Sequence, residues 1–167
     1  RARGRAGGGA AAGLIGAQAC ALGEMVSRLS SSGKNTDDFR EKAEQYAAIF
    51  ESARSIFLDL MDEDAKNFCE LMALLQSPRD PADTKRKEKL EAAFKKSAEA
   101  PYQMADAMSE LLPAFTQLLL HCNKNVITDA VIAAEEAVSC IRAARLNVEI
   151  NAKYVKDEFY AREMKAS

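Results

Sequence analysis

Three consecutive glycines, Gly7 to Gly9, stand directly before a run of small side chains and are the first residues whose spacing is suited to chemistry. Glycine costs about 1 kcal/mol relative to alanine inside a helix, so three at a helix start require an explanation. Bare backbone N–H groups at the positive end of a helix dipole can hold an anion at contact distance. The alternative is that small residues let two helices or two subunits approach closely. The glycines alone leave both explanations open.

Asp64 places a carboxylate in the middle of an otherwise apolar helical stripe. Apolar side chains recur at spacings of three and four on either side of it, at Phe57, Leu60, Phe68 and Leu71. An acid that faces a core is costly unless it is paired, and its pKa is expected to be shifted. The pattern favours a functional carboxylate over a buried ion pair or a helix twist that exposes the side chain.

A third group of polar residues lies between two apolar segments and comprises Asn123, Lys124, Asn125, Thr128 and Asp129. A helix cap at Asn125 or Thr128, with Asp129 in the first turn, accounts for one or two of these residues but not for all five. Two amides beside a carboxylate are also suited to binding the donor and acceptor edge of a heterocycle. Near the C-terminus, Lys156 and Asp157 would on their own be an ordinary surface pair.

Taken in order, these motifs resemble a known family. The glycine-rich opening is followed by Met61–Phe68, by Asn123–Ala130, and by Leu146–Asn151 ahead of Lys156–Phe159. Together they are similar to the cyclodeaminase/methenyltetrahydrofolate cyclohydrolase family, which also occurs as the cyclodeaminase domain of formiminotransferase-cyclodeaminase. The similarity covers nearly the whole chain. It departs from the usual pattern at the glycines, where Ala6 and Ala10 replace the family's proline and serine.

The resemblance implies an all-α, homo-oligomeric enzyme that acts on one-carbon derivatives of tetrahydrofolate without a metal or other cofactor. It assigns catalysis to Asp64 and, as second choice, to Asp129. It assigns substrate binding to a further set of residues, which are Gly7, Gly8, Gly9, Asn123, Asn125, Thr128 and Lys156. The amides would bind the pterin edge, and the glycines and the lysine would bind the glutamate tail. The competing interpretation is a non-catalytic helical bundle that binds folate or another protein. The resemblance leaves open whether the reaction expels ammonia, as in a cyclodeaminase, or begins with attack by water, as in a cyclohydrolase.

Composition sets wider bounds. The chain has 167 residues with 48% hydrophobic and 29% charged residues and a formal net charge of -2, which is typical of one compact domain over residues 1–167. No basic patch with interleaved aromatic residues indicates nucleic acid, and no segment is apolar enough to predict a membrane span. Four scattered cysteines and one histidine favour a reducing, cytoplasmic compartment and predict no zinc site.

The elements that must position these residues are all expected to be helices. We expect an up-and-down bundle of about five to six helices, one of them very long, from about residue 36 to residue 76. Pro101 is expected to break the chain into separate third and fourth helices, and a short amphipathic helix is expected over 154–164. Residues 1–6 are expected to be disordered or foreign to the fold. The small faces of the first helix favour a homodimer or a larger homo-oligomer.

Overall fold

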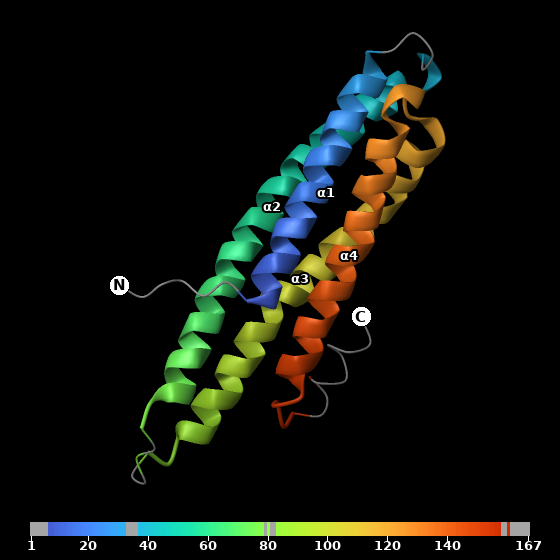
Figure 1. Cartoon of the computed structure of the whole chain (residues 1–167). Coiled ribbons are helices and arrows are strands. Elements are labelled where there is room, and N and C mark those ends of the chain that lie inside the picture. Colours follow the sequence, from blue (N-terminus) through green and yellow to red (C-terminus); the bar gives the residue numbers. More distant parts are fainter. Residues whose placement is uncertain (1–6, 33–36, 79, 81–82, 158–159, 161–167) are drawn as a thin grey trace.

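The computed structural model describes residues 7–32, 37–78, 80, 83–157 and 160. Within these ranges it contains four α-helices and no strand (Figure 1). The helices are α1 (Gly8–Ser31), α2 (Asp37–Gln76), α3 (Arg86–His121) and α4 (Ile127–Ala152), with a short 3-10 helix, η1 (Lys124–Val126), before α4. They run up and down in one bundle, so the all-α fold class is confirmed.

The expected number of five to six helices is wrong. The expectation of a single very long helix is also wrong, because α2 is not the only long one. The expected third and fourth helices form one helix, α3, which has 36 residues and includes both Pro101 and Pro113. The chain therefore has two long helices, because α2 has 40 residues. Of the expected C-terminal helix, residues 154–157 form no helix, and 158, 159 and 161–164 lie outside the described residues.

Pro101 is accommodated inside α3 because another helix supplies the hydrogen bond that it removes. Proline has no N–H to donate to the carbonyl four residues earlier, which is that of Ser97. The side-chain amide of Asn151 on α4 donates to this carbonyl oxygen at 3.1 Å, and that of Asn67 on α2 donates to the adjacent Lys96 carbonyl at 3.3 Å. Asn151 therefore replaces the hydrogen bond that the proline removes, and Asn67 adds a second contact beside it.

We expect Asn151→Ala to lower the free energy of unfolding by about 1–3 kcal/mol, because the Ser97 carbonyl is left buried without a donor. Pro101→Ala should recover part of this loss in the Asn151→Ala background, since alanine restores the missing N–H. Chemical unfolding of the four proteins in this double-mutant cycle measures the coupling. Strictly additive effects of the two substitutions would show that Asn151 does not replace the missing backbone bond.

The core contains side chains of all four helices, and within it α1 packs closely against α2. A side chain at Gly16 would press on the ring of Phe57, and one at Gly23 would lie 3.1 Å from the ring of Phe50. Both phenylalanines are fully buried. The small residues of α1 therefore serve close helix packing in the middle of the bundle, as one of the two explanations of the glycines requires.

The helix α1 also has the length and apolar character of a membrane-spanning helix, although the sequence predicts none. The mean hydropathy of its most apolar stretch is 1.3, and 56% of that stretch is buried inside the bundle. A core helix of a bundle meets the same criteria, and α1 is packed as one. Cys20 and Cys140 are buried, whereas Cys69 is exposed.

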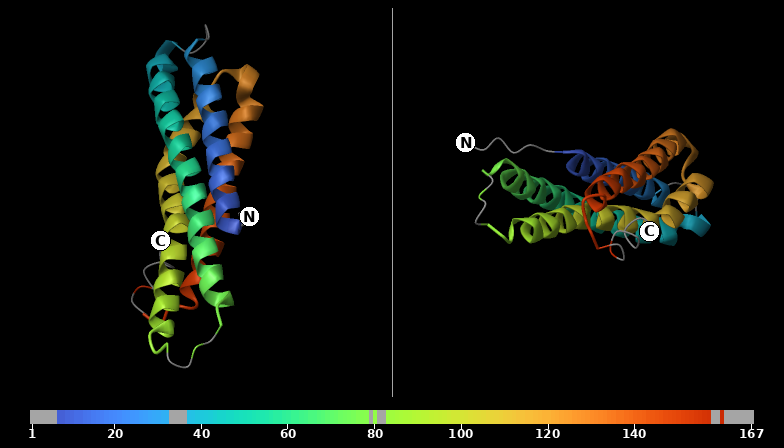
Figure 2. Two further views of the ribbon diagram at one scale, coloured as in Figure 1. Left: turned by 90° about the vertical axis from the view of Figure 1, so that its left-hand side faces the viewer. Right: turned by 90° about the horizontal axis from the view of Figure 1, so that it is seen from below.

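The helix α1 begins part-way along the bundle (Figures 1 and 2). Beyond its first residue, α2 and α3 continue to the loop that joins them, with the end of α4 alongside. The N-terminus of α1 therefore lies against the sides of longer helices and not at the end of the molecule. This arrangement brings side chains of α2 and α4 to the first turn of α1.

Candidate active site at the start of α1

The carboxylate of Asp64 lies directly on the backbone of Gly9. A side-chain carbon at Gly9 would overlap this carboxylate, with its distance to Oδ2 only 2.6 Å. The backbone N–H of Ala10 donates a hydrogen bond to Asp64. Gly9 is therefore glycine because an acid from α2 occupies the place of its side chain. The glycine motif and the carboxylate on the apolar stripe, which are separate in the sequence, are therefore in direct contact.

Asp64 has the properties of a group that transfers protons. Its side chain is 6% exposed. Burial raises the pKa of the carboxyl above its usual value, while the hydrogen bond from Ala10 opposes this and lowers it. Burial is the larger effect, so the protonated form is favoured more than in water. A buried acid with a raised pKa can accept a proton and return it.

The other two glycines differ in what surrounds them. A side chain at Gly8 would lie 3.0 Å from Oδ1 and 3.1 Å from Nδ2 of Asn147, so the polar edge of this amide faces the Gly8 backbone. At Gly7 the nearest atom is a ring carbon of Phe68 at 3.9 Å, which is ordinary contact. The first turn of α1 is thus bordered by an acid and an aromatic ring from α2 and by an amide from α4.

The predicted group at residues 123–129 lies at the opposite end of α1. The backbone N–H of Asn123 donates to the Ser30 hydroxyl at 3.0 Å. Ser30 follows Gly8 by 22 residues, which at ~1.5 Å per residue is about 33 Å along the helix. Within a single chain, four of the predicted site residues are therefore far from Asp64. They are Asn123, Asn125, Thr128 and Asp129.

The cap in this segment is at neither of the expected residues. The side chain of Asn123 accepts the backbone N–H of Asn125 at 3.0 Å and so caps η1. The cap position of α4 is Val126, which makes no side-chain cap hydrogen bond. Thr128 and the backbone-bonded Asn125 are exposed, and Asp129 is half-buried in the first turn of α4. Capping thus explains Asn123, and Asp129 lies in the first turn of α4 as expected, which leaves Lys124, Asn125 and Thr128 unexplained.

Lys156 lies at the same end of the bundle as Asp64, but on its surface. Its backbone N–H donates to Glu91 at 3.2 Å, and its side chain is exposed. Glu91 precedes Ser97 by six residues on α3, so Lys156 is beyond the level of Asn151. The neighbouring Asp157 forms an ion pair with Lys95 at 2.8 Å.

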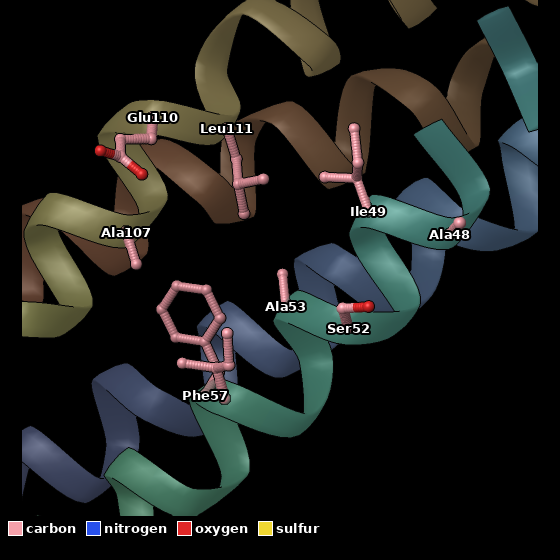
Figure 3. Close-up of a pocket in the computed structure, with 9 residues that line it drawn as sticks. Ala48, Ile49, Ser52, Ala53, Phe57, Ala107, Glu110 and Leu111 are labelled. Carbon is pink, nitrogen blue, oxygen red and sulfur yellow. The ribbon is translucent and has the colours of Figure 1, made fainter. Parts of the chain in front are cut away.

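A separate hollow between α2 and α3 has a different character (Figure 3). It measures about 430 Å³ and is mainly apolar, with the ring of Phe57 and the side chains of Ile49 and Leu111 at its wall. Glu110 is its one charged lining residue. This hollow lacks the combination of acid, amide and helix N-terminus found at Asp64, so we place no chemistry in it.

Sequence reasoning missed the polar side chains that share a level with Asp64. Asn67 and Ser97 are 2% and 4% exposed, and Asn147 and Asn151 are half-buried. The spacing contained an indication, because Asn67 follows Asp64 by three residues and Asn151 follows Asn147 by four. Each pair therefore lies on one face of its helix.

Comparison with known proteins identifies the family. A sequence profile described as formiminotransferase-cyclodeaminase matches residues 2–167. The chain belongs to this family. It is 29% identical over 159 residues to a methenyltetrahydrofolate cyclohydrolase of Methylorubrum extorquens, covering 94% of this chain and 76% of the relative. It is 26% identical over 157 residues to a formimidoyltransferase-cyclodeaminase of Mus musculus, of which it spans only 29%.

The family relationship extends to three-dimensional structure. The fold matches the crystal structure of a formiminotetrahydrofolate cyclodeaminase from Thermotoga maritima with a TM-score of 0.85 and 29% sequence identity. The match covers 98% of this chain and 79% of that one. The resemblance inferred from the ordered motifs is therefore confirmed at the level of the family.

Proposed function

We propose that the chain is a folate enzyme of one-carbon metabolism, a 5-formiminotetrahydrofolate cyclodeaminase or a 5,10-methenyltetrahydrofolate cyclohydrolase. Family membership supports the substrate class. The observation that carries the chemistry is the buried Asp64 carboxylate, which rests on Gly9 and accepts the Ala10 N–H. Both reactions are acid–base chemistry on the folate itself, and we assign no metal or cofactor to them.

In cyclodeamination, N10 attacks the carbon of the protonated formimino group to form a tetrahedral centre. Asp64 accepts the proton that N10 loses and returns it to the exocyclic nitrogen. The bond from the carbon to this nitrogen then breaks, ammonia leaves, and the 5,10-methenyl cation remains. One carboxyl group serves both transfers if it is protonated in one step and ionised in the next, which a raised pKa favours.

In cyclohydrolysis, water attacks the carbon of the methenyl cation. Asp64 takes one proton from the water and delivers it to N5 as the bond between N5 and the carbon breaks. The remaining hydroxyl proton passes to solvent as the formyl C=O forms, which gives 10-formyltetrahydrofolate. The ionised carboxylate also stabilises the cation before water attacks. The two reactions share the methenyl compound, so one site can serve either.

Near-ultraviolet absorbance of the methenyl compound tests the proposed function. We expect purified protein to accelerate the loss of 5,10-methenyltetrahydrofolate, or its appearance from 5-formiminotetrahydrofolate. The first result would establish a cyclohydrolase and the second a cyclodeaminase. If neither rate changes but a reduced folate binds saturably, the chain is the non-catalytic folate-binding bundle. If nothing binds, the proposal is wrong.

We also propose that the chain forms a homodimer through the outer faces of α1 and α4. Exposed apolar side chains recur at helical spacing along both; they are Leu14, Met25 and Leu29 on α1 and Ile132, Leu146 and Ile150 on α4. An antiparallel pairing about the middle of α1 would set its start beside the end of α1 in a second copy. Asp64 of one copy would then approach the segment 123–129 of the other.

Mixing two inactive variants tests this shared site. If the sites are built from both copies, Asp64→Asn and Asn125→Ala chains, each of low activity, should regain up to about a quarter of wild-type activity when they are unfolded and refolded together. Refolding each variant alone is the control. A dimer by light scattering with no recovery on mixing would show that each copy carries its own site.

A further inference from the structure

The turn that follows α4, residues 153–157, is attached to the side of α3. The Glu91 carboxylate on α3 accepts the backbone N–H groups of Lys156 and Asp157 at 3.2 and 3.3 Å. Lys95, one helical turn further along α3, forms an ion pair with the Asp157 carboxylate at 2.8 Å. Two charged side chains of α3 therefore hold this segment, the C-terminal turn, in one place on the bundle.

The C-terminal turn carries two lysines whose charges have no partner. Lys153 and Lys156 are exposed, and no hydrogen bond or ion pair of either ammonium group is recorded in the part of the chain that the structure describes. Lys96 on α3, by contrast, pairs with Glu70 at 2.6 Å. Two unpaired ammonium groups three residues apart are suited to a ligand with two carboxylates, because each can form a charge-assisted hydrogen bond.

An aromatic residue with an open surface lies between these two lysines in the chain. Tyr154 is 56% exposed, and its ring stacks on that of Phe94 from α3. The ring centroids are 4.7 Å apart and the ring planes differ by 20°. The stacking fixes the Tyr154 ring and leaves much of it open to a ligand. A second aromatic ring that stacks on such a platform gains about 0.5–1.5 kcal/mol beyond the area it buries.

The C-terminal turn lies at a distance from Asp64 that a folate can span. Asn147 faces Gly8 and the Asp64 carboxylate lies on Gly9, so both are near the level at which α1 begins. Tyr154 follows Asn147 by seven residues, which is about 10 Å further along the bundle. The end of α4 lies beyond the start of α1 in this direction (Figure 1). In folate, the rigid aminobenzoyl group holds the glutamate carboxylates ~10 Å from N10.

We propose that the C-terminal turn binds the p-aminobenzoylglutamate half of the folate. Tyr154 stacks on the aminobenzoyl ring, and Lys153 and Lys156 pair with the two carboxylates of the glutamate. Glu91 is a positioning residue, because it holds the backbone of Lys156 in place. This inference rests on the proposed function, since it names the site for another part of the same substrate.

The assignment changes the one implied by the resemblance, which gave the glutamate tail to the glycines together with Lys156. The carboxylate of Asp64 already lies on Gly9. An ionised Asp64 would repel a substrate carboxylate at the same helix start. Lysine side chains attract the tail instead, so Lys156 keeps its predicted role and Lys153 joins it.

Two substrates that differ only in the glutamate test the proposal, namely 5,10-methenyltetrahydrofolate and 5,10-methenyltetrahydropteroate, or the matching formimino pair for a cyclodeaminase. We expect the wild-type KM to be about 10-fold lower for the substrate with glutamate, because exposed ion pairs contribute up to about 1 kcal/mol each. The double variant Lys153→Met, Lys156→Met should raise this KM about 10-fold, with kcat and the KM for the pteroate nearly unchanged. Tyr154→Leu should raise both KM values, since both substrates contain the aminobenzoyl ring.

The double variant Lys89→Met, Lys96→Met is the matched control, because it removes the same charge from lysines that already pair with Asp83 and Glu70. It should leave both KM values as in wild type. Equal wild-type KM values for the two substrates, or the same rise in KM in both double variants, would overturn the role of the C-terminal turn while wild-type turnover upholds the proposed function. A wild-type protein that neither turns over nor binds a reduced folate would contradict both.

Discussion

Asp64→Asn is expected to lower kcat by about 10²–10⁴-fold, because asparagine cannot accept and return a proton. The helical fold should be retained, since asparagine has nearly the same shape and its amide oxygen can still accept the N–H of Ala10. Stopped-flow or steady-state absorbance of the methenyl compound measures the rate, and circular dichroism checks the fold. Activity within a few-fold of wild type in a folded variant would remove Asp64 from the mechanism.

The same substitution should stabilise the protein at neutral pH. Burial raises the pKa of Asp64 above its usual value, so the folded protein binds more protons than the unfolded chain between the two pKa values. Stability therefore falls as pH rises through this window, and the deficit remains above it. Asp64→Asn removes the deficit. Its thermal midpoint should exceed that of wild type at pH 7–8, and the difference should shrink below the usual pKa of aspartate.

Gly9→Ala is expected to reduce activity more than 100-fold and to lower the free energy of unfolding by about 1–3 kcal/mol. The added methyl group would overlap the Asp64 carboxylate, so either the acid or the start of α1 must move. A displacement of about 1 Å at a reacting group is enough for a loss of this size. Activity and chemical unfolding of the purified variant measure the two effects.

Gly7→Ala is the comparison that isolates this steric cause. A methyl group at Gly7 would meet only the Phe68 ring, at 3.9 Å, and the backbone there is extended, a conformation open to any residue. We expect a much smaller loss for Gly7→Ala than for Gly9→Ala. Comparable losses would mean that the glycines matter for backbone freedom or for direct contact with substrate, and not as the place of the Asp64 side chain.

Patterns local to one helix were predictable from the sequence. The start of α1 follows from the glycines and the small-residue run, and the limits of α2 were expected close to where they lie. Asp64 could be singled out because a carboxylate interrupts a stripe on its own helix. The order of motifs along the chain was sufficient to indicate the family.

Features that depend on contacts between helices were not predictable in this way. The rule that proline breaks a helix is overridden at Pro101 by an amide from α4, which no local pattern shows. The contact of Asn147 with Gly8 depends on which turns of α1 and α4 face each other. The separation of Asn123 from Asp64 along α1 likewise requires the packing, because order along the chain carries no distance.

The pH dependence of kcat/KM for wild type and Asp64→Asn tests most directly whether the carboxylate beneath α1 performs the proton transfer. After subtraction of the uncatalysed rate, we predict that wild-type activity rises with pH through an apparent pKa above the usual value for aspartate. This limb should be absent from the small residual activity of Asp64→Asn. The same limb in both proteins would contradict the assignment, because another group would then be titrating.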